Sequence, residues 1–244
     1  MFSVIHYHGL PITSATVALS AIKNGHAFVS FRYPDQLGIA LEVCQSFAVD
    51  NGAFSAWKAG EPIEDWFRYY LWVAELHRYP SFDFAVIPDV IDGDEQANDE
   101  LLAEWPWTGR NAAVGAPVWH MHESIARLQR LADEWPRVCL GSSGQYATVG
   151  NAEWWERMSE AMNAVCDRNG RPVTKLHGLR MLNPKVFSKL PLSSADSTNI
   201  ARNVGIDKNW VRGSYLPASK EMRAAVMRER IESCNSLTFW DNIK

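Results

Sequence analysis

Several features that are common in proteins are missing from this sequence of 244 residues. No apolar stretch approaches the ~20 residues needed to cross a bilayer, and no basic segment followed by an apolar run opens the chain. The four cysteines are scattered, without the CxxC or zinc-finger spacing of a redox pair or metal site. No internal repeat, low-complexity segment or linker rich in Pro, Gly or Ser is present. These absences predict one cytoplasmic domain with reduced thiols and no membrane contact.

Basic residues are fewer than acidic ones, and they are unevenly distributed along the chain. The formal net charge of −4 is not typical of a nucleic-acid-binding protein. Residues 1–167 contain 10 Lys and Arg against 22 Asp and Glu, whereas residues 168–244 contain 14 against 6. The basic C-terminal third could contact phosphates, or it could be a solvated helix surface. The charge pattern alone leaves both interpretations open.

Short apolar runs alternate with amphipathic, helix-like segments along the chain. The expected strands are residues 2–7, 27–31, 47–49, 84–87, 117–119, 138–140, 175–179 and 192–195. The expected helices are residues 14–24, 62–77, 94–104, 123–134, 152–168, 184–189 and 219–233. Strands that alternate with helices pair in parallel, and eight of them match a closed barrel better than an open sheet. The sequence therefore predicts an α/β fold, a single (β/α)₈ TIM-type barrel over residues 1–244.

Ionisable residues follow the expected strands with unusual regularity. Three of the strands are followed by the aspartates Asp50, Asp89 and Asp196. Histidines stand at or after other strand ends, and these are His6, His8, His120, His122 and His177. Barrel enzymes carry their chemistry at the carboxyl ends of the strands. We therefore expect an active site built chiefly from the three aspartates.

Six short motifs occur in order between residues 46 and 200. They are Asp50-Asn51-Gly52-Ala53-Phe54, Pro88-Asp89, the strand that ends at His120, Gly141-Ser142-Ser143-Gly144, His177-Gly178 and Asp196-Ser197. This series resembles the tRNA-guanine transglycosylase superfamily, whose matching segments bind the base and carry a nucleophilic aspartate. The resemblance implies a barrel that exchanges bases without a cofactor. His120 stands where the family has a glutamine.

The chain departs from that family in one large part. The tRNA-modifying members carry a zinc subdomain with Cys-x-Cys-x-x-Cys, and this sequence has no such spacing. A compact branch from phages and bacterial genomic islands, which exchanges guanine in DNA for a 7-deazaguanine, is more similar. The resemblance thus implies a barrel without zinc subdomain, metal or other cofactor. It also implies two partners, which are DNA and a 7-deazaguanine base, either 7-cyano-7-deazaguanine or a derivative. The protein is expected to be a monomer or weak homodimer. It would lie in the cytoplasm, which for a phage protein is the cytoplasm of the host.

The chemistry of base exchange suggests a role for each aspartate. The transition state has oxocarbenium character, so a carboxylate can stabilise it and form a covalent glycosyl intermediate. We assign Asp196 as this nucleophile and Asp50 as the general acid/base. Asp89 accepts hydrogen bonds from the guanine N1–H and 2-amino groups, since a carboxylate is an acceptor.

Other residues are expected to surround the base and the polynucleotide. The expected base contacts are His120, Gly141, Ser142, Ser143, Gly144, Phe54, His177 and Gly178. Backbone N–H groups in residues 141–144 would donate to the base O6, and Phe54 or Tyr146 would stack on a flipped-out base. The expected nucleic-acid contacts are Arg180, Lys185, Arg202, Lys208 and Arg212.

Alternative interpretations use the same residues. Asp50-Asn51-Gly52 could be only a turn, Asp89 could be an N-cap or part of the acidic loop 92–95, and Asp196 could cap a helix near Thr198. The strand-end histidines together with Asp196 could hold zinc, as in amidohydrolase-like barrels. Exchange on tRNA or RNA, and a nucleic-acid-binding relative without activity, also stay open.

Overall fold

Parallel strands form one continuous sheet in the computed structural model, which describes residues 4–63, 65–206 and 217–241. The strands are β1 (Ile5–Leu10), β2 (His26–Ser30), β3 (Ser46–Asp50), β4 (Phe82–Val86), β5 (Gly115–Ala116), β6 (Val118–His120), β7 (Arg137–Gly141), β8 (Lys175–Gly178) and β9 (Ser194–Ser197). Each of the eight expected strands is present, although the first runs over Ile5–Leu10 instead of residues 2–7 and the last begins two residues later than the sequence predicts. The sequence did not predict β5. The strands follow the order β5-β4-β3-β2-β1-β9-β8-β7-β6.

The two edges of this order are consecutive pieces of one chain segment. Strand β5 pairs with β4, and β6 pairs with β7. Between them stands Pro117, which has no N–H to donate to a sheet, although its carbonyl accepts from the Cys139 N–H at 2.8 Å. The sheet therefore closes at this segment. The structure confirms the predicted α/β fold as a single TIM-type barrel.

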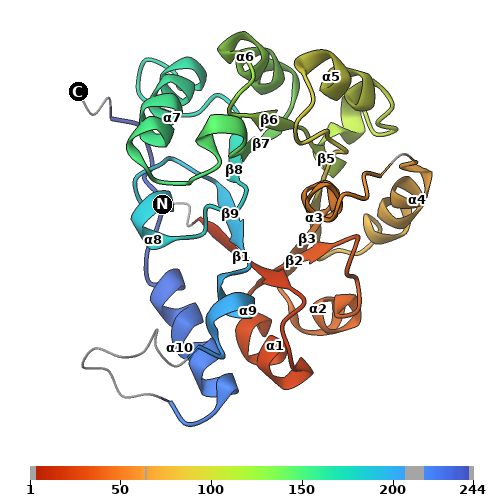
Figure 1. Ribbon diagram of the computed structural model, residues 1–244, viewed down its shortest axis with the longest axis vertical. Helices are drawn as coiled ribbons and strands as arrows, with labels where there is room; N and C mark the ends of the chain where they lie inside the picture. The colour runs from red at the N-terminus through yellow and green to blue at the C-terminus, as the bar shows by residue number, and fades with distance from the viewer. Residues whose placement is uncertain (1–3, 64, 207–216, 242–244) are drawn as a thin grey trace.

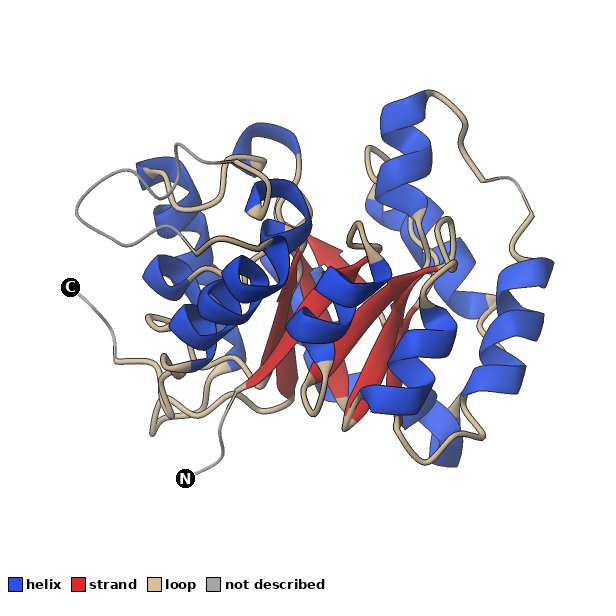
Figure 2. Cartoon of the chain, turned by 90° about the horizontal axis from the view of Figure 1, so that it is seen from below, coloured by secondary structure: helices blue, strands red, loops and turns tan. Residues whose placement is uncertain are grey.

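Helices surround the barrel as an outer ring, as Figure 1 shows along the barrel and Figure 2 from the side. They are α1 (Ala15–Ile22), α2 (Leu37–Val43), α3 (Ala53–Ala59), α4 (Phe67–Leu76), α5 (Glu95–Ala103), α6 (Ile125–Glu134), α7 (Ala152–Val165), α8 (Pro184–Phe187), α9 (Asn199–Asn203) and α10 (Lys220–Glu232), with short 3₁₀ turns at Gly109–Val114 and Gly144–Tyr146. The sequence did not predict α2 and α3, and it offered α9 only as a helix near Thr198 that Asp196 could cap. No helix in the described ranges is long and apolar enough to cross a membrane.

Two hydrophobic clusters fill the fold, because side chains alternate across each strand. The larger lies between strands and helices, and the smaller fills the barrel interior. The buried members of the interior cluster are Tyr7, Phe28, Ala48, Phe84, Val86, Ala116, Val118 and Cys139. Each large apolar side chain buried in this way contributes about 1.5–3 kcal/mol. The interior is therefore a packed core that leaves room only at its ends.

A charged cluster lies at the amino-terminal end of the strands. Asp83 accepts a hydrogen bond from the Tyr7 hydroxyl at 2.5 Å and from Arg137 Nη2 at 3.0 Å. The Arg137 guanidinium also lies 4.1 Å from the centre of the Phe84 ring. Burial by itself would raise the pKa of Asp83, but the Arg137 charge and these hydrogen bonds outweigh it and lower the pKa. This carboxylate is fully paired and has a structural role.

Candidate active site

A cavity of about 320 Å³ opens at the carboxyl-terminal end of the barrel. Asp50 ends β3, Asp89 follows β4, and Asp196 lies within β9. Because carboxyl ends of parallel strands meet at one end of a barrel, all three side chains line this one cavity. The structure thus brings together the three aspartates that the sequence singled out.

Asp50 is the carboxylate that lacks a cation. The structure places no Lys, Arg or His nitrogen of the described residues within ion-pair distance of it. The Gly52 N–H donates to its Oδ2 atom at 3.2 Å. Burial, and then the negative charges of Asp196 and Asp89, raise the pKa of Asp50 to about 7. Near neutral pH this group can therefore both give and accept a proton.

The turn after Asp50 also shapes the cavity. Gly52 has φ +84°, a left-handed conformation that other residues seldom adopt, and a side chain there would meet Arg32. The Asn51 amide donates to Asp89 Oδ1 at 2.6 Å and to the Ile87 carbonyl at 2.9 Å, while its oxygen accepts from the Ala53 N–H at 2.8 Å. The motif thus forms a turn, and this turn places Asp50 and Asn51 in the cavity lining.

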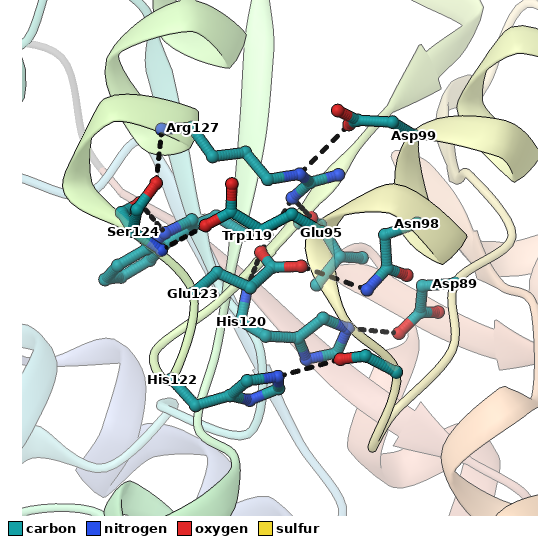
Figure 3. Close-up of polar contacts among 12 residues, drawn as sticks. Asp89, Glu95, Asn98, Asp99, Trp119, His120, His122, Glu123, Ser124 and Arg127 are labelled. Atoms are coloured by element: carbon teal, nitrogen blue, oxygen red, sulfur yellow. Dashed lines mark hydrogen bonds and ion pairs between the residues drawn. The ribbon is translucent and has the colours of Figure 1, made fainter.

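Asp89 is held from a second side by His120. The Nε2 atom of His120 lies 2.9 Å from Asp89 Oδ2, and both side chains are buried. The main-chain N–H of His120 donates to Glu123 Oε2 at 2.8 Å, and this buried carboxylate pairs with Arg127 Nη1 at 2.7 Å. Figure 3 shows this network of contacts. It fixes His120, and through His120 it fixes Asp89.

Asp196 has fixed partners on its Oδ1 atom. The Arg180 N–H donates to it at 2.9 Å, and His177 Nε2 lies 3.3 Å away. The His177 Nδ1 atom lies 2.8 Å from Ser194 Oγ, and the ring has no exposed surface. Burial lowers the pKa of His177 despite the nearby carboxylate. His177 was expected to contact substrate, but it is enclosed in the barrel behind Asp196 and does not line the cavity.

The predicted nucleic-acid contacts occupy different places. Arg180 and Arg202 are exposed and line the cavity mouth. The Arg180 guanidinium lies 4.2 Å from the centre of the Phe54 ring and donates to the Ser142 carbonyl at 2.6 Å. Lys185 is exposed on α8, away from the cavity lining. Lys208 and Arg212 lie outside the described residues.

The segment 141–144 contributes unevenly. Gly141, Ser142 and Ser143 line the cavity, as do Phe54 and His120. Gly144 does not line it; this residue is exposed, with φ +54°, and a side chain on it would meet His122. Gly178 is buried outside the lining, and a side chain on it would collide with Met181 and Leu192. The structure therefore does not place Gly144 and Gly178 where the expected base contacts would need them. Tyr146, a stacking candidate, lies beside Arg157 and outside the cavity lining.

The capping interpretations of the aspartates do not hold. The cap of α5 is Asp94, whose carboxylate accepts from the Ala97 N–H at 2.9 Å. At the start of α9, the Asn199 N–H is bonded to Ser197 Oγ at 3.3 Å. Asp89 and Asp196 are thus free of capping roles and face the cavity.

The proposed zinc ligands do not converge. His6 Nε2 contacts the Cys234 carbonyl at 3.0 Å, and His8 Nε2 contacts Glu232 Oε1 at 3.1 Å. Both partners belong to α10 or follow it, so these histidines point out of the barrel. Within the described ranges, no three His, Cys, Asp or Glu side chains are grouped as a metal site would require. The amidohydrolase-like interpretation therefore loses the His-x-His pair on which it depended.

The sequence missed several residues at the site. Asn51 belongs to the first of the six motifs, but no role was predicted for it from the sequence. Its position next to Asp50 could have indicated that it lies at the site. Lys58 and Tyr33 line the cavity mouth from α3 and from the segment after β2. Nothing in their spacing pointed to the site, and α3 itself was not predicted.

Comparison with known proteins supports the fold. No protein-family model matches this chain, and no curated protein gives a significant match. One similar crystal structure is that of a protein assigned as a fructose-1,6-biphosphate aldolase from Coccidioides immitis. The TM-score is 0.54 with 13% sequence identity, over 95% of this chain and 88% of that chain. At this identity the similarity shows the shared barrel fold alone.

Proposed function

We propose that this cavity exchanges a guanine base in DNA for a 7-deazaguanine through a covalent glycosyl ester. The observation that carries the proposal is the contrast between two carboxylates of one cavity. Asp196 is buried and held by the Arg180 N–H, whereas the pKa of Asp50 is raised to about 7. A fixed nucleophile beside a group that can carry a proton is what cleavage and re-formation of a glycosidic bond require.

The reaction follows from these two groups. An oxygen of Asp196 attacks C1′ while the C1′–N9 bond breaks, and protonated Asp50 gives its proton to the departing guanine. The incoming base then loses its N9 proton to the Asp50 carboxylate. Its N9 atom attacks C1′ and releases Asp196, so that Asp50 ends protonated as it began. No net proton is consumed, and the sugar keeps its configuration after two displacements.

The remaining cavity residues suit a purine substrate. Each oxygen of Asp89 already has one protein partner, Asn51 or His120, and keeps a lone pair for the N1–H and 2-amino groups of guanine. Arg180, Arg202 and Lys58 around the mouth suit the phosphates beside a flipped-out nucleotide. DNA, rather than tRNA, rests on the resemblance to the compact branch of the transglycosylases.

The test is base exchange by the purified protein. Isotope-labelled guanine or 7-cyano-7-deazaguanine is incubated with DNA and, in parallel, with tRNA, and the nucleosides are measured by mass spectrometry. We expect label in DNA with the wild-type protein and none with Asp196→Asn. Label in tRNA alone would show the base exchange but contradict DNA as the substrate. Absence of label from both polynucleotides would overturn the proposal.

A further inference from the structure

His122 has both ring nitrogens in contact with protein atoms. Its Nε2 atom lies 3.0 Å from the Gly93 carbonyl, and its Nδ1 atom lies 2.8 Å from Ser143 Oγ. A carbonyl oxygen can only accept a hydrogen bond, so Nε2 must carry a hydrogen. The role of Ser143 then depends on whether Nδ1 carries a second one.

The surroundings of His122 fix which ring nitrogen carries the hydrogen of a neutral ring. Its ring is stacked on that of His120, with centroids 5.6 Å apart and planes 25° from parallel. Of this pair, His120 has the carboxylate neighbour, Asp89 at 2.9 Å. No carboxylate in the described ranges forms an ion pair with His122. A neutral imidazole carries one ring hydrogen, which the Gly93 carbonyl holds on Nε2, so Nδ1 offers its lone pair and accepts from the Ser143 hydroxyl.

The Ser143 hydroxyl therefore donates its hydrogen to His122 Nδ1. Ser143 is buried, with 5% of its surface exposed, and it lines the cavity. Its oxygen therefore offers only lone pairs to a ligand. Gly144 stands beside His122, and a side chain at position 144 would come within 3.3 Å of the His122 Cβ.

We propose that Ser143 is a specificity-determining residue that acts as a fixed hydrogen-bond acceptor, with its polarity set by His122. It accepts a hydrogen bond from an N–H group on the base bound in the cavity that Ser143 and Asp89 both line. This inference rests on the proposed base exchange. Guanine and 7-deazaguanines carry N1–H and 2-amino donors, whereas adenine has an unprotonated N1. A fixed acceptor attracts the first and repels the second, which is how buried polar groups discriminate strongly.

The experiment compares the binding of free guanine and free adenine by calorimetry. Ser143→Ala is expected to weaken guanine binding about tenfold, the loss of one hydrogen bond, while adenine binding stays the same or improves. His122→Phe leaves the hydroxyl free to donate, so discrimination against adenine falls. His122→Asn keeps an acceptor near the Nδ1 position and restores discrimination. Ser159→Ala, on α7, removes a hydroxyl that bonds the Trp155 carbonyl and is the matched control, with no change expected.

Two outcomes would overturn the inference. One is an equal effect of Ser143→Ala on both bases, or no effect on either, which a merely structural role would give. The other comes from ¹⁵N NMR of the His122 ring, where the neutral tautomer with hydrogen on Nε2 is expected and a doubly protonated ring contradicts it. The NMR result does not depend on base binding. Failure of the proposed function would appear as no binding of either base, and it can therefore be distinguished from failure of this inference.

Discussion

The two ends of this barrel treat a partly buried carboxylate in opposite ways. At the amino-terminal end, Arg137 and Tyr7 surround Asp83 and lower its pKa. At the carboxyl-terminal end, burial and two other carboxylates raise the pKa of Asp50 to about 7. At the amino-terminal end, the Asp83–Arg137 ion pair links strands β4 and β7. At the carboxyl-terminal end, three carboxylates lie close together, and no described Lys, Arg or His forms an ion pair with Asp50.

This difference between Asp83 and Asp50 indicates that residues for stability lie at one end of the barrel and residues for chemistry at the other. A paired carboxylate stabilises the folded state above its ordinary pKa, whereas an unpaired one beside other carboxylates destabilises it there. An arrangement that costs stability is typical of active sites. The comparison therefore predicts that substitutions at the two ends have effects of opposite kind.

The largest effect is expected from Asp196→Asn. Loss of the nucleophilic oxygen should reduce base exchange by at least about a thousandfold, because an amide does not form the glycosyl ester. The free energy of unfolding should change little, since the Arg180 N–H can still donate to the amide oxygen. Exchange assays and urea denaturation measure the two quantities. Retention of more than a tenth of the wild-type rate would exclude Asp196 as the nucleophile.

Arg137→Met should have the largest effect on stability. Removal of the cation leaves the partly buried Asp83 without its ion-pair partner. The cost should be below the about 3–5 kcal/mol of a fully buried pair, because solvent reaches part of this carboxylate. The wild-type pKa of Asp83 is lowered, so its stabilising contribution is present at neutral pH and is lost as pH falls through that pKa. Urea denaturation at pH 7 and at pH 3 should show the penalty at the higher pH and a smaller one at the lower. An equal penalty at both would contradict the ion-pair account.

Asp50→Asn should change the free energy of unfolding in the opposite direction, towards greater stability. The raised pKa means that ionisation of Asp50 destabilises the fold progressively from about pH 4 to pH 7. The variant should therefore be more stable than the wild type at pH 8, by about 1–3 kcal/mol, and equally stable at pH 4. Exchange should fall by about a hundredfold or more, as for loss of a general acid. A variant less stable at pH 8 would show that Asp50 is paired after all.

The smallest effect is on pH dependence. Because base departure needs protonated Asp50, kcat for exchange should fall about tenfold per pH unit above pH 7. Steady-state rates from pH 5.5 to pH 9 measure this, with unfolding monitored in the same buffers as the control. A rate that stays constant up to pH 9 would exclude Asp50 as the proton donor.

Much of this arrangement follows from the sequence, because parallel strands bring their carboxyl ends together. Once eight strands were recognised, Asp50, Asp89 and Asp196 had to meet at one end. The direction of a side chain across a strand was harder to predict. In β1, Tyr7 points into the barrel whereas His6 and His8 point out of it. Both faces of a barrel strand are buried, so alternation does not distinguish inside from outside.

The contacts within the site needed the structure. Whether His177 meets a substrate or supports Asp196 depends on distances across strands β8 and β9, which residue spacing does not give. Helices α2 and α3 were missed because seven residues are too few for a clear helical period. The opposite environments of Asp50 and Asp83 likewise come from tertiary neighbours.

The most direct test of the central claim is to trap the glycosyl ester. Wild-type protein is incubated with an oligonucleotide that contains guanine, without an incoming base, and is quenched in acidic denaturant and digested. We predict a peptide that carries the sugar–phosphate chain on Asp196 and that is absent from Asp196→Asn. An adduct on another residue, or base release from the oligonucleotide without any adduct, would contradict the account.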